Sequence, residues 1–399
     1  MVLNAARREQ VVALCKEMVR RPSLSGHEEE MAALMRHTMT ALGYDEVDTD
    51  RYGNVVGVVR GAPGGKRLLF EGHMDHVEVS SPERWTKDPF GGVLEDGRIY
   101  GRGSSDMKGS IAAMLLAAAY VREDCRDRMT GEILVAGSVH EECFEGVASR
   151  EIGEQYRPDY VVIGEASQLN LKRGQRGRAE VVIETVGRPA HSSNPEAGLN
   201  AVKKMVKLLS AVEERFVPSR HPVLGKGILE LTDIISSPYP GASVVPERCR
   251  VTFDRRLLVG ESEEDVLGEL RAIVSEVQAR DPDLEAVVAY AVGEDRCYTG
   301  NPIKAKRFMP AWLLDEDHEF VQEALAGLRA VGLDPQVTHY SFCTDGSYYA
   351  GVAGIPTIGF GPSREDLAHV VDEYIEVDQL VKACEGFYGI ARSLLVREK

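Results

Sequence analysis

LLFEGHMDH, residues 68–76, is the stretch of this chain that decides its fold. A run of apolar residues ends there, and His73 and Asp75 follow at once, two positions apart. Two further apolar runs, ILVAGSVHEE (133–142) and DYVVIGE (159–165), end in glutamates. Open α/β sheets gather functional groups at the carboxyl ends of their strands. Three strands that end in metal-binding residue types therefore predict one shared site at a sheet edge.

The alternation of apolar strands and helices around this segment predicts an α/β domain with a mostly parallel, covered sheet. The pattern changes near Arg176, where the elements follow the β-α-β-β-α-β order of a ferredoxin-like α+β unit. After Gly293 the first pattern returns. The 399 residues are too many for one ordinary core. We therefore expect a catalytic domain in two parts, residues 1–175 and 294–399, interrupted by an inserted domain at 176–293.

Local signals place the first elements of the catalytic domain. The sequence predicts a helix that ends near Arg21, and Ser25 with Glu28 predicts a capping box for a second helix, which Gly43 ends. A strongly apolar helix is expected over 110–121.

Composition excludes several classes of protein. The net charge of −16 makes nucleic acid or an anionic membrane a poor partner. No apolar run reaches 18 residues, so we expect no membrane span. The seven cysteines are scattered and form no C-x-x-C pair, which is typical of a reduced, cytoplasmic protein.

Six side chains carry the chemistry that the sequence suggests: His73, Asp106, Glu141, Glu142, Glu165 and His369. Imidazoles with carboxylates suit Zn, Co or Mn better than Ca or an iron–sulfur cluster. The carboxylates outnumber the needs of one tetrahedral zinc, whereas two metals about 3.5–4 Å apart would use them all. Each residue alone also has an ordinary structural explanation, such as a helix cap or a solvated loop, so the hypothesis depends on their joint occurrence.

Three classes of function stay open from the residues alone. The first is a dinuclear metal amidohydrolase, and the second is a catalytically silent metal- or ligand-binding protein of the same fold. The third is a nucleotide-binding α/β protein, because GRGSSDMKGS (101–110) is rich in glycine. That segment lacks the glycine spacing of phosphate-binding loops, and Asp106 at its centre would repel phosphate.

The motifs occur in an order that resembles the M20 family of co-catalytic metallopeptidases and deacylases, which includes acetylornithine deacetylase and succinyl-diaminopimelate desuccinylase. The motifs that carry this resemblance are GHMD (72–75), GRGSSDMKG (101–109), HEEC (140–143), GEAS (164–167), GRPAHSSNPEAGLNA (187–201) and AHVVDE (368–373). Further stretches resemble the YgeY-type, selenium-metabolism-linked branch of that family: RGQRGR (173–178), FDRRL (253–257) and IGFGP (358–362).

The resemblance implies a zinc-peptidase-like catalytic domain that cleaves an amide bond with a metal-bridging hydroxide. It implies two divalent ions, Zn first and Co or Mn as alternatives, with five ligands: His73 and Glu165 on one ion, Glu142 and His369 on the other, and Asp106 between them. Glu141 would be the general base, and Asp75 would orient His73.

The resemblance also gives the inserted domain the role of a lid and of a homodimer interface. His191 would reach across the dimer to stabilise an oxyanion, and Arg256 would grip a substrate carboxylate. Thr344 and Asp345 would form part of the substrate wall. The local sequence allows simpler interpretations, a helix-capping turn for His191 and a salt bridge for Arg256. The expected partner is a small carboxylate-bearing amide, with deacylase, dipeptidase and N-carbamoyl amidohydrolase activities all open.

Overall fold

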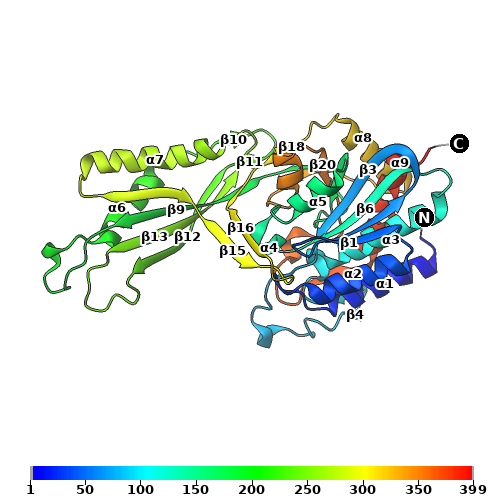
Figure 1. Ribbon diagram of the computed structural model, residues 1–399, viewed down its shortest axis with the longest axis horizontal. Coiled ribbons are helices and arrows are strands. Elements are labelled where there is room, and N and C mark those ends of the chain that lie inside the picture. Colours follow the sequence, from blue (N-terminus) through cyan, green and yellow to red (C-terminus); the bar gives the residue numbers. More distant parts are fainter. Residues whose placement is uncertain (1–2, 398–399) are drawn as a thin grey trace. The chain divides into compact units, whose positions relative to one another are not determined.

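The computed structural model describes residues 3–397, and the chain divides into two compact units (Figure 1). Unit 2 contains Arg176–Gly293 and Ala305–Ala311. Unit 1 contains the residues before Arg176, the segment Glu294–Lys304 and the chain from Trp312 onward. The sequence had predicted that everything after Gly293 belongs to the catalytic domain, so the segment 305–311 is a difference from that division.

Backbone pairing explains why this segment belongs to unit 2. Strand β17 (Phe308–Met309) pairs antiparallel with Arg178 and Ala179 of β9 (Gly177–Val186). A two-residue strand carries too little hydrophobic pattern to be recognised in the sequence, because its position depends on the partner strand rather than on its own residues.

The sheet of unit 1 has parallel strands at its centre and antiparallel strands at its margins. β6, β3, β7 and β20 pair in parallel, while the pairs β1/β2, β2/β6 and β8/β18 are antiparallel. The strand order is β1 (Glu46–Thr49), β2 (Val55–Arg60), β6 (Thr130–Ser138), β3 (Ala62–His73), β7 (Tyr160–Ile163), β20 (Thr357–Gly359), β8 (Leu171–Gln175) and β18 (Trp312–Leu313), with β19 (Val337–Tyr340) also beside β8. The carboxyl ends of the inner strands therefore meet at one edge.

Helices cover both faces of this sheet, because successive strand residues point to opposite sides. Phe70 of β3 packs edge-on against Phe387 of α9 (Val377–Leu395), with ring centroids 5.2 Å apart. The preceding Leu69 instead lies in a buried cluster with Ile152 and Tyr349. The helices of unit 1 are α1 (Ala5–Val19), α2 (Glu29–Ala41), α3 (Gly109–Cys125), α4 (Glu141–Phe144), α5 (Ser149–Tyr156), α8 (Glu319–Ala330) and α9.

The apolar helix expected over 110–121 is confirmed as α3, which is buried along all of that length. The predicted capping box before α2 is wrong. Glu28 occupies the N-cap of α2 without a side-chain cap, and the Ser25 hydroxyl donates to Asp75 instead, at 2.7 Å. A serine before a helix can cap it through its side-chain oxygen. In this fold the Ser25 hydroxyl bonds to the buried carboxylate of Asp75 instead.

Unit 2 confirms the predicted β-α-β-β-α-β order. Its sheet has the strand order β12-β13-β9-β14, all antiparallel, and one hydrophobic cluster joins the sheet to both helices. Every second residue of β9 is buried, as expected for a strand with one covered face. The main elements are β9, α6 (Ala201–Arg215), β12 (Ile228–Ser237), β13 (Arg248–Leu257), α7 (Glu263–Arg280) and β14 (Glu285–Tyr290).

Short elements complete the chain, and none of the helices between residues 3 and 397 has the length and apolar character needed to cross a membrane. The short helical turns are η1 (Pro82–Arg84), η2 (Ser104–Lys108), η3 (Pro195–Ala197), η4 (Ser347–Val352) and η5 (Glu365–Leu367). The short strands are β4 (Val93–Glu95), β5 (Arg98–Tyr100), β10 (Arg220–His221), β11 (Gly225–Lys226), β15 (Val292–Arg296), β16 (Pro302–Lys306) and β21 (Tyr374–Glu376).

The core of unit 2 gives a first testable prediction. Ile183→Ala removes a fully buried side chain from β9 and should lower the free energy of unfolding by about 2–5 kcal/mol, because a cavity remains. Val287→Ala on β14, where Val287 is 59% exposed, should change it by less than about 0.5 kcal/mol. Urea unfolding followed by circular dichroism measures both, and equal effects would contradict the assignment of this core.

Candidate metal centre

Three parallel strands deliver the first ligands to one place. His73 is the last residue of β3, Glu141 and Glu142 begin α4 directly after β6, and Glu165 lies two residues beyond β7. His73, Glu141 and Glu165 are almost completely buried, at 1%, 7% and 5% exposure. Carboxylates and imidazoles of this kind are rarely buried unless they are paired or bind a metal.

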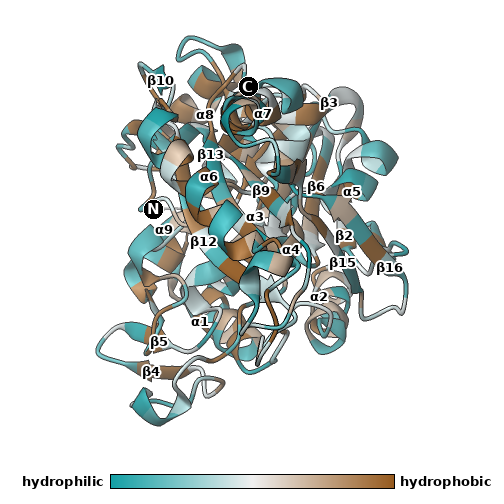
Figure 2. Cartoon of the chain, turned by 90° about the vertical axis from the view of Figure 1, so that its left-hand side faces the viewer, coloured by the Kyte–Doolittle hydropathy of each residue, from teal (hydrophilic) through white to brown (hydrophobic). Residues whose placement is uncertain are grey.

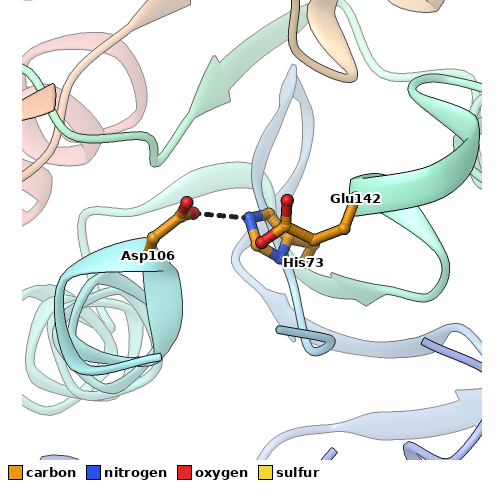
Figure 3. Close-up of side chains that lie close together, drawn as sticks. All are labelled: His73, Asp106 and Glu142. Atoms are coloured by element: carbon orange, nitrogen blue, oxygen red, sulfur yellow. Dashed lines mark hydrogen bonds and ion pairs between the residues drawn. The ribbon is translucent and has the colours of Figure 1, made fainter. Parts of the chain in front are cut away.

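Asp106 lies between the two histidines. Its Oδ1 is 2.9 Å from His73 Nε2, and its Oδ2 is 3.2 Å from His369 Nε2. Figure 3 shows Asp106 and His73 facing each other from opposite sides, with Glu142 beside them. Gly101 and Gly103 shape the loop before Asp106 and have φ angles of +150° and +80°, which favour glycine. Each carboxylate oxygen of Asp106 thus faces a different imidazole.

The two remaining glutamates divide between these imidazoles. Glu165 Oε1 lies 3.4 Å from His73 Nε2, and Glu142 Oε2 lies 3.0 Å from His369 Nε2. The five side chains expected to hold metal therefore form two halves that share Asp106. His369 is the exposed member, with 51% of its side chain accessible, and its φ of +63° places it in the left-handed region of a loop.

The residues present fit a divalent metal ion. Two groups, His73/Asp106/Glu142 and His73/Glu141/Glu165, can each offer ligand atoms within 4.8 Å of one another. His73 Nδ1 donates to the carbonyl oxygen of Asp75 at 3.0 Å, so a neutral His73 would direct the lone pair of Nε2 to the shared space and could bind a metal with it. Nitrogen and carboxylate ligands in this number suit Zn, Co or Mn.

The electrostatics of the metal-free site show a surplus of negative charge. Burial, followed by the charge of Asp106, raises the pKa of Glu142 to about 7. Burial likewise raises the pKa of Glu141 well above its usual range. Hydrogen bonds to Asp106 and Glu142 raise the pKa of His369 to about 10. Several carboxylates crowd together here, and divalent ions bound between them would offset their mutual repulsion.

Asp75, expected to orient His73, contacts both His73 and the start of α4. Its backbone carbonyl, not its carboxylate, makes the close contact with His73, because Oδ1 lies 3.6 Å from Nδ1. The carboxylate instead accepts the backbone N–H groups of Glu141 and Glu142, at 3.1 and 3.2 Å, and the hydroxyl of Ser25. Asp75 therefore fixes the start of α4, and with it the direction of both glutamates.

Thr344 and Asp345 are placed differently from the predicted substrate wall. Both are buried, at 0% and 3% exposure. Thr344 donates its hydroxyl to Gln175 at 2.6 Å, and Asp345 accepts the hydroxyl of Ser138 at 2.8 Å and the N–H of Gly146. The geometry favours a supporting position behind the site over direct contact with a substrate, because their oxygens are already bonded within the protein.

Two of the predicted site residues, His191 and Arg256, belong to unit 2, and their contacts lie within that unit. His191 is exposed, and its Nδ1 lies 2.7 Å from the Ser193 hydroxyl. It does not cap α6, since Asn200 does so by accepting the N–H of Lys203. Arg256 Nε forms a salt bridge with Asp254 at 2.7 Å. Their contacts with an oxyanion and a substrate carboxylate stay predictions.

Sequence reasoning missed residues that support the ligands. The Tyr340 hydroxyl donates to the backbone carbonyl of Glu165 at 3.0 Å. Glu28 is buried at the start of α2 and accepts the N–H of His140, just before the two glutamates, at 3.2 Å. Tyr340 had no local signal beyond its residue type, and the pattern around Glu28 indicated a helix cap instead. Glu373 had one, because it ends the AHVVDE motif, but it was given no role.

A parallel sheet with a histidine–carboxylate centre at its edge, joined to an α+β insertion, defines a metal-dependent hydrolase. The family model described as Peptidase family M20/M25/M40 matches residues 69–393. The chain belongs to this family. YgeY, an uncharacterized protein of Escherichia coli (strain K12), is 33% identical over 388 residues, covering 96% of this chain and 94% of YgeY. Succinyl-diaminopimelate desuccinylase 2 of Ruegeria sp. (strain TM1040) is 27% identical over 391 residues, covering 95% and 93%.

Solved structures show the same fold. Aminopeptidase PepT from Bacillus cereus ATCC 10987 has a TM-score of 0.76 at 20% identity, covering 99% of this chain and 100% of PepT. Bacillus subtilis YXEP, described as a dinuclear metal binding peptidase from the M20 family, has a TM-score of 0.72 at 14% identity, covering 98% of both chains. The chain is thus a metal-dependent hydrolase of the deacylase and peptidase type that acts on amide bonds.

Metal binding to the metal-free protein should release protons. Near pH 7 the raised pKa of about 10 keeps His369 protonated, and an imidazolium must lose a proton before it can bind a metal. We expect proton release in zinc titrations run in buffers of different ionisation enthalpy, and an apparent affinity that increases with pH because proton competition weakens. His369→Gln should release about one proton fewer. Binding without proton release would contradict this protonation state.

Proposed function

We propose that this chain is a dinuclear hydrolase that cleaves the amide bond of an N-acyl amino acid or dipeptide-type substrate. The observation that carries the proposal is the position of Asp106, whose two oxygens face His73 and His369 separately. Glu165 and Glu142 then supply one further carboxylate to each side. A single ion would need only one of these halves, so the duplication supports two ions with Asp106 as the bridge.

The proposed ions are zinc first, with cobalt or manganese as alternatives. Bound there, they would supply Lewis-acid polarisation of the amide carbonyl and activation of water near neutral pH. His73 and Glu165 would hold one ion, and Glu142 and His369 the other. Bacillus subtilis YXEP is described as a dinuclear metal binding peptidase from the M20 family, which supports two ions in this centre.

Glu141 is the proposed general base. It belongs to the group with His73 and Glu165, whereas Glu142 belongs to the group with His73 and Asp106, so the two neighbouring glutamates offer their oxygens to different sets of partners. Burial raises the pKa of Glu141, which brings the carboxylate closer to the range where it can accept a proton and return it near neutral pH. We infer that it takes a proton from the attacking water and passes it to the leaving amine nitrogen.

The proposed substrate is a small amide that bears a carboxylate. The name succinyl-diaminopimelate desuccinylase 2 supports an N-acyl amino acid, and the name aminopeptidase PepT supports a peptide. Arg256, with its planar guanidinium, is the proposed carboxylate partner. An N-carbamoyl amide and a catalytically silent, metal-binding role are the alternatives. The test is turnover of the zinc- or cobalt-loaded protein on N-acyl amino acids, dipeptides and N-carbamoyl amino acids, and no turnover on any of them would favour the silent role.

We also propose a cytoplasmic homodimer that forms through unit 2. The edge strand β12 exposes Leu231, Ile234 and Ile235, at 39%, 50% and 49%. Figure 2 shows hydrophobic segments along β12. Exposed apolar edge strands invite pairing with another chain, and a second copy would cover this one. The scattered cysteines support a reducing location.

Glu141→Gln separates catalysis from metal binding. The variant should keep both metal ions, because Glu141 is not one of the proposed ligands, and lose turnover by a factor on the order of 10²–10⁴. Metal analysis and steady-state kinetics on the best substrate measure the two effects. Glu154→Gln, an exposed change on α5, is the matched control and should leave both unchanged. A Glu141→Gln enzyme with full turnover would exclude Glu141 as the base.

The double variant Ile234→Lys/Ile235→Lys tests the dimer. Two charges on β12 should repel the same strand of a second copy and shift the protein to monomer in sedimentation velocity at micromolar concentration. Val287→Lys on β14, at the opposite edge of the same sheet, is the control and should stay dimeric. A wild-type protein that sediments as a monomer would rule out this interface.

A further inference from the structure

One buried carboxylate lies between the two loops that carry Asp106 and His369. Glu373 is completely buried, follows His369 by four residues and precedes β21. β21 pairs with β5, just ahead of the Asp106 loop. The chain therefore brings the end of the His369 loop against the start of the Asp106 loop, and Glu373 is the charged residue at that junction.

Both oxygens of Glu373 are fully used by the Asp106 loop. Oε2 accepts from Arg102 Nη1 at 2.7 Å and from the N–H of Gly103 at 3.1 Å. Oε1 accepts the N–H of Ser105 at 2.8 Å and that of Asp106 at 3.1 Å. Four donors from residues 102–106 thus surround one carboxylate. Hydrogen bonds to an ionised acceptor are stronger than neutral ones, and together they define the path of this loop.

Arg102 completes the charge balance of this junction. Its side chain is 1% exposed, and its guanidinium lies over the ring of Trp85, 5.4 Å from the centroid. A buried ion pair of this kind adds little to net stability but is very sensitive to the loss of one partner. The main effect of the Arg102–Glu373 pair is therefore on geometry, because it fixes how the Asp106 loop lies against the His369 loop.

Other contacts hold the far side of the His369 loop. Asp372 accepts both the N–H and the hydroxyl of Thr86, each at 2.8 Å. The hydroxyls of Ser363 and Ser105 lie 2.6 Å apart. The loop that carries His369 is therefore hydrogen-bonded on both sides of this residue. Ser363 contacts Ser105 of the Asp106 loop, and Asp372 contacts Thr86. Of these ties, Glu373 alone bonds directly to the backbone of Asp106.

We propose that Glu373 is a positioning residue that sets the spacing between Asp106 and His369 and so joins the two halves of the metal centre. This inference rests on the dinuclear centre proposed above. A glutamine at this position keeps the shape but has one acceptor oxygen, and its NH₂ group would face either Ser105 and Asp106 or Arg102 and Gly103. One pair of donors would lose its partner, and the spacing would relax.

The test uses cobalt as the probe. Metal-free wild type and Glu373→Gln are titrated with Co²⁺ by calorimetry, and the visible absorption of the bound ions reports their ligand geometry. We expect the variant to bind at least one ion about 10–100-fold more weakly, with an altered spectrum, because supporting partners orient metal ligands. Thermal unfolding of the metal-free proteins measures any loss of stability separately.

Asp50→Asn is the matched control. Asp50 accepts the backbone N–H groups of Tyr52, Gly53 and Asn54 in a turn that carries no proposed ligand. This control should change stability without changing cobalt affinity or the spectrum. Should Glu373→Gln fail to fold, Glu373→Asp makes the same comparison, because it keeps the charge but shortens the reach.

The outcomes separate the two proposals. Weaker cobalt binding and a changed spectrum in the Glu373 variant, with Asp50→Asn like wild type, support the positioning role. A Glu373 variant that is less stable yet binds cobalt with wild-type affinity and spectrum would overturn it and leave the dinuclear centre intact. A wild-type protein that takes up no cobalt would overturn the proposed centre itself, and this inference with it.

Discussion

Mutual repulsion among buried carboxylates is the constraint on which this structure depends. Asp106, Glu141, Glu142 and Glu165 lie close together at the carboxyl edge of one sheet, beside the imidazoles of His73 and His369. Such a cluster is expensive in a protein interior unless cations or protons balance it. Burial raises the pKa of Glu142, and hydrogen bonds to Asp106 and Glu142 raise the pKa of His369, which are both consequences of this crowding; divalent ions bound there would offset it.

Other residues of unit 1 position the segments that carry this cluster. They do so through hydrogen bonds to backbone N–H groups and hydroxyls. Asp75 binds the start of α4, and Glu373 binds the Asp106 loop. Asp75 and Glu373 are themselves acidic, and Arg102 forms a buried ion pair with Glu373. Membership in the M20 family agrees with a centre of this composition.

Much of the fold could be predicted because its signals are local. Apolar runs with polar ends placed β3, β6 and β7, and the continuous apolar pattern of 110–121 placed α3. The insertion was visible as a change of pattern near Arg176. The two differences share one cause: Ser25 and β17 each have a partner far away in the sequence. Their residue types allow several partners, and only packing selects one.

The sequence by itself determined which residue types end each strand, and therefore that the site would be made of histidine and carboxylate. The spacing of apolar residues shows where each strand ends. The alternation of strands and helices predicts parallel strands, whose carboxyl ends lie at the same edge of the sheet. Only the tertiary structure decided that Asp106 faces both histidines and that the carboxylate of Asp75 accepts the backbone N–H groups of Glu141 and Glu142. Those choices depend on distances of about 3 Å between segments that are tens to hundreds of residues apart, which no local pattern encodes.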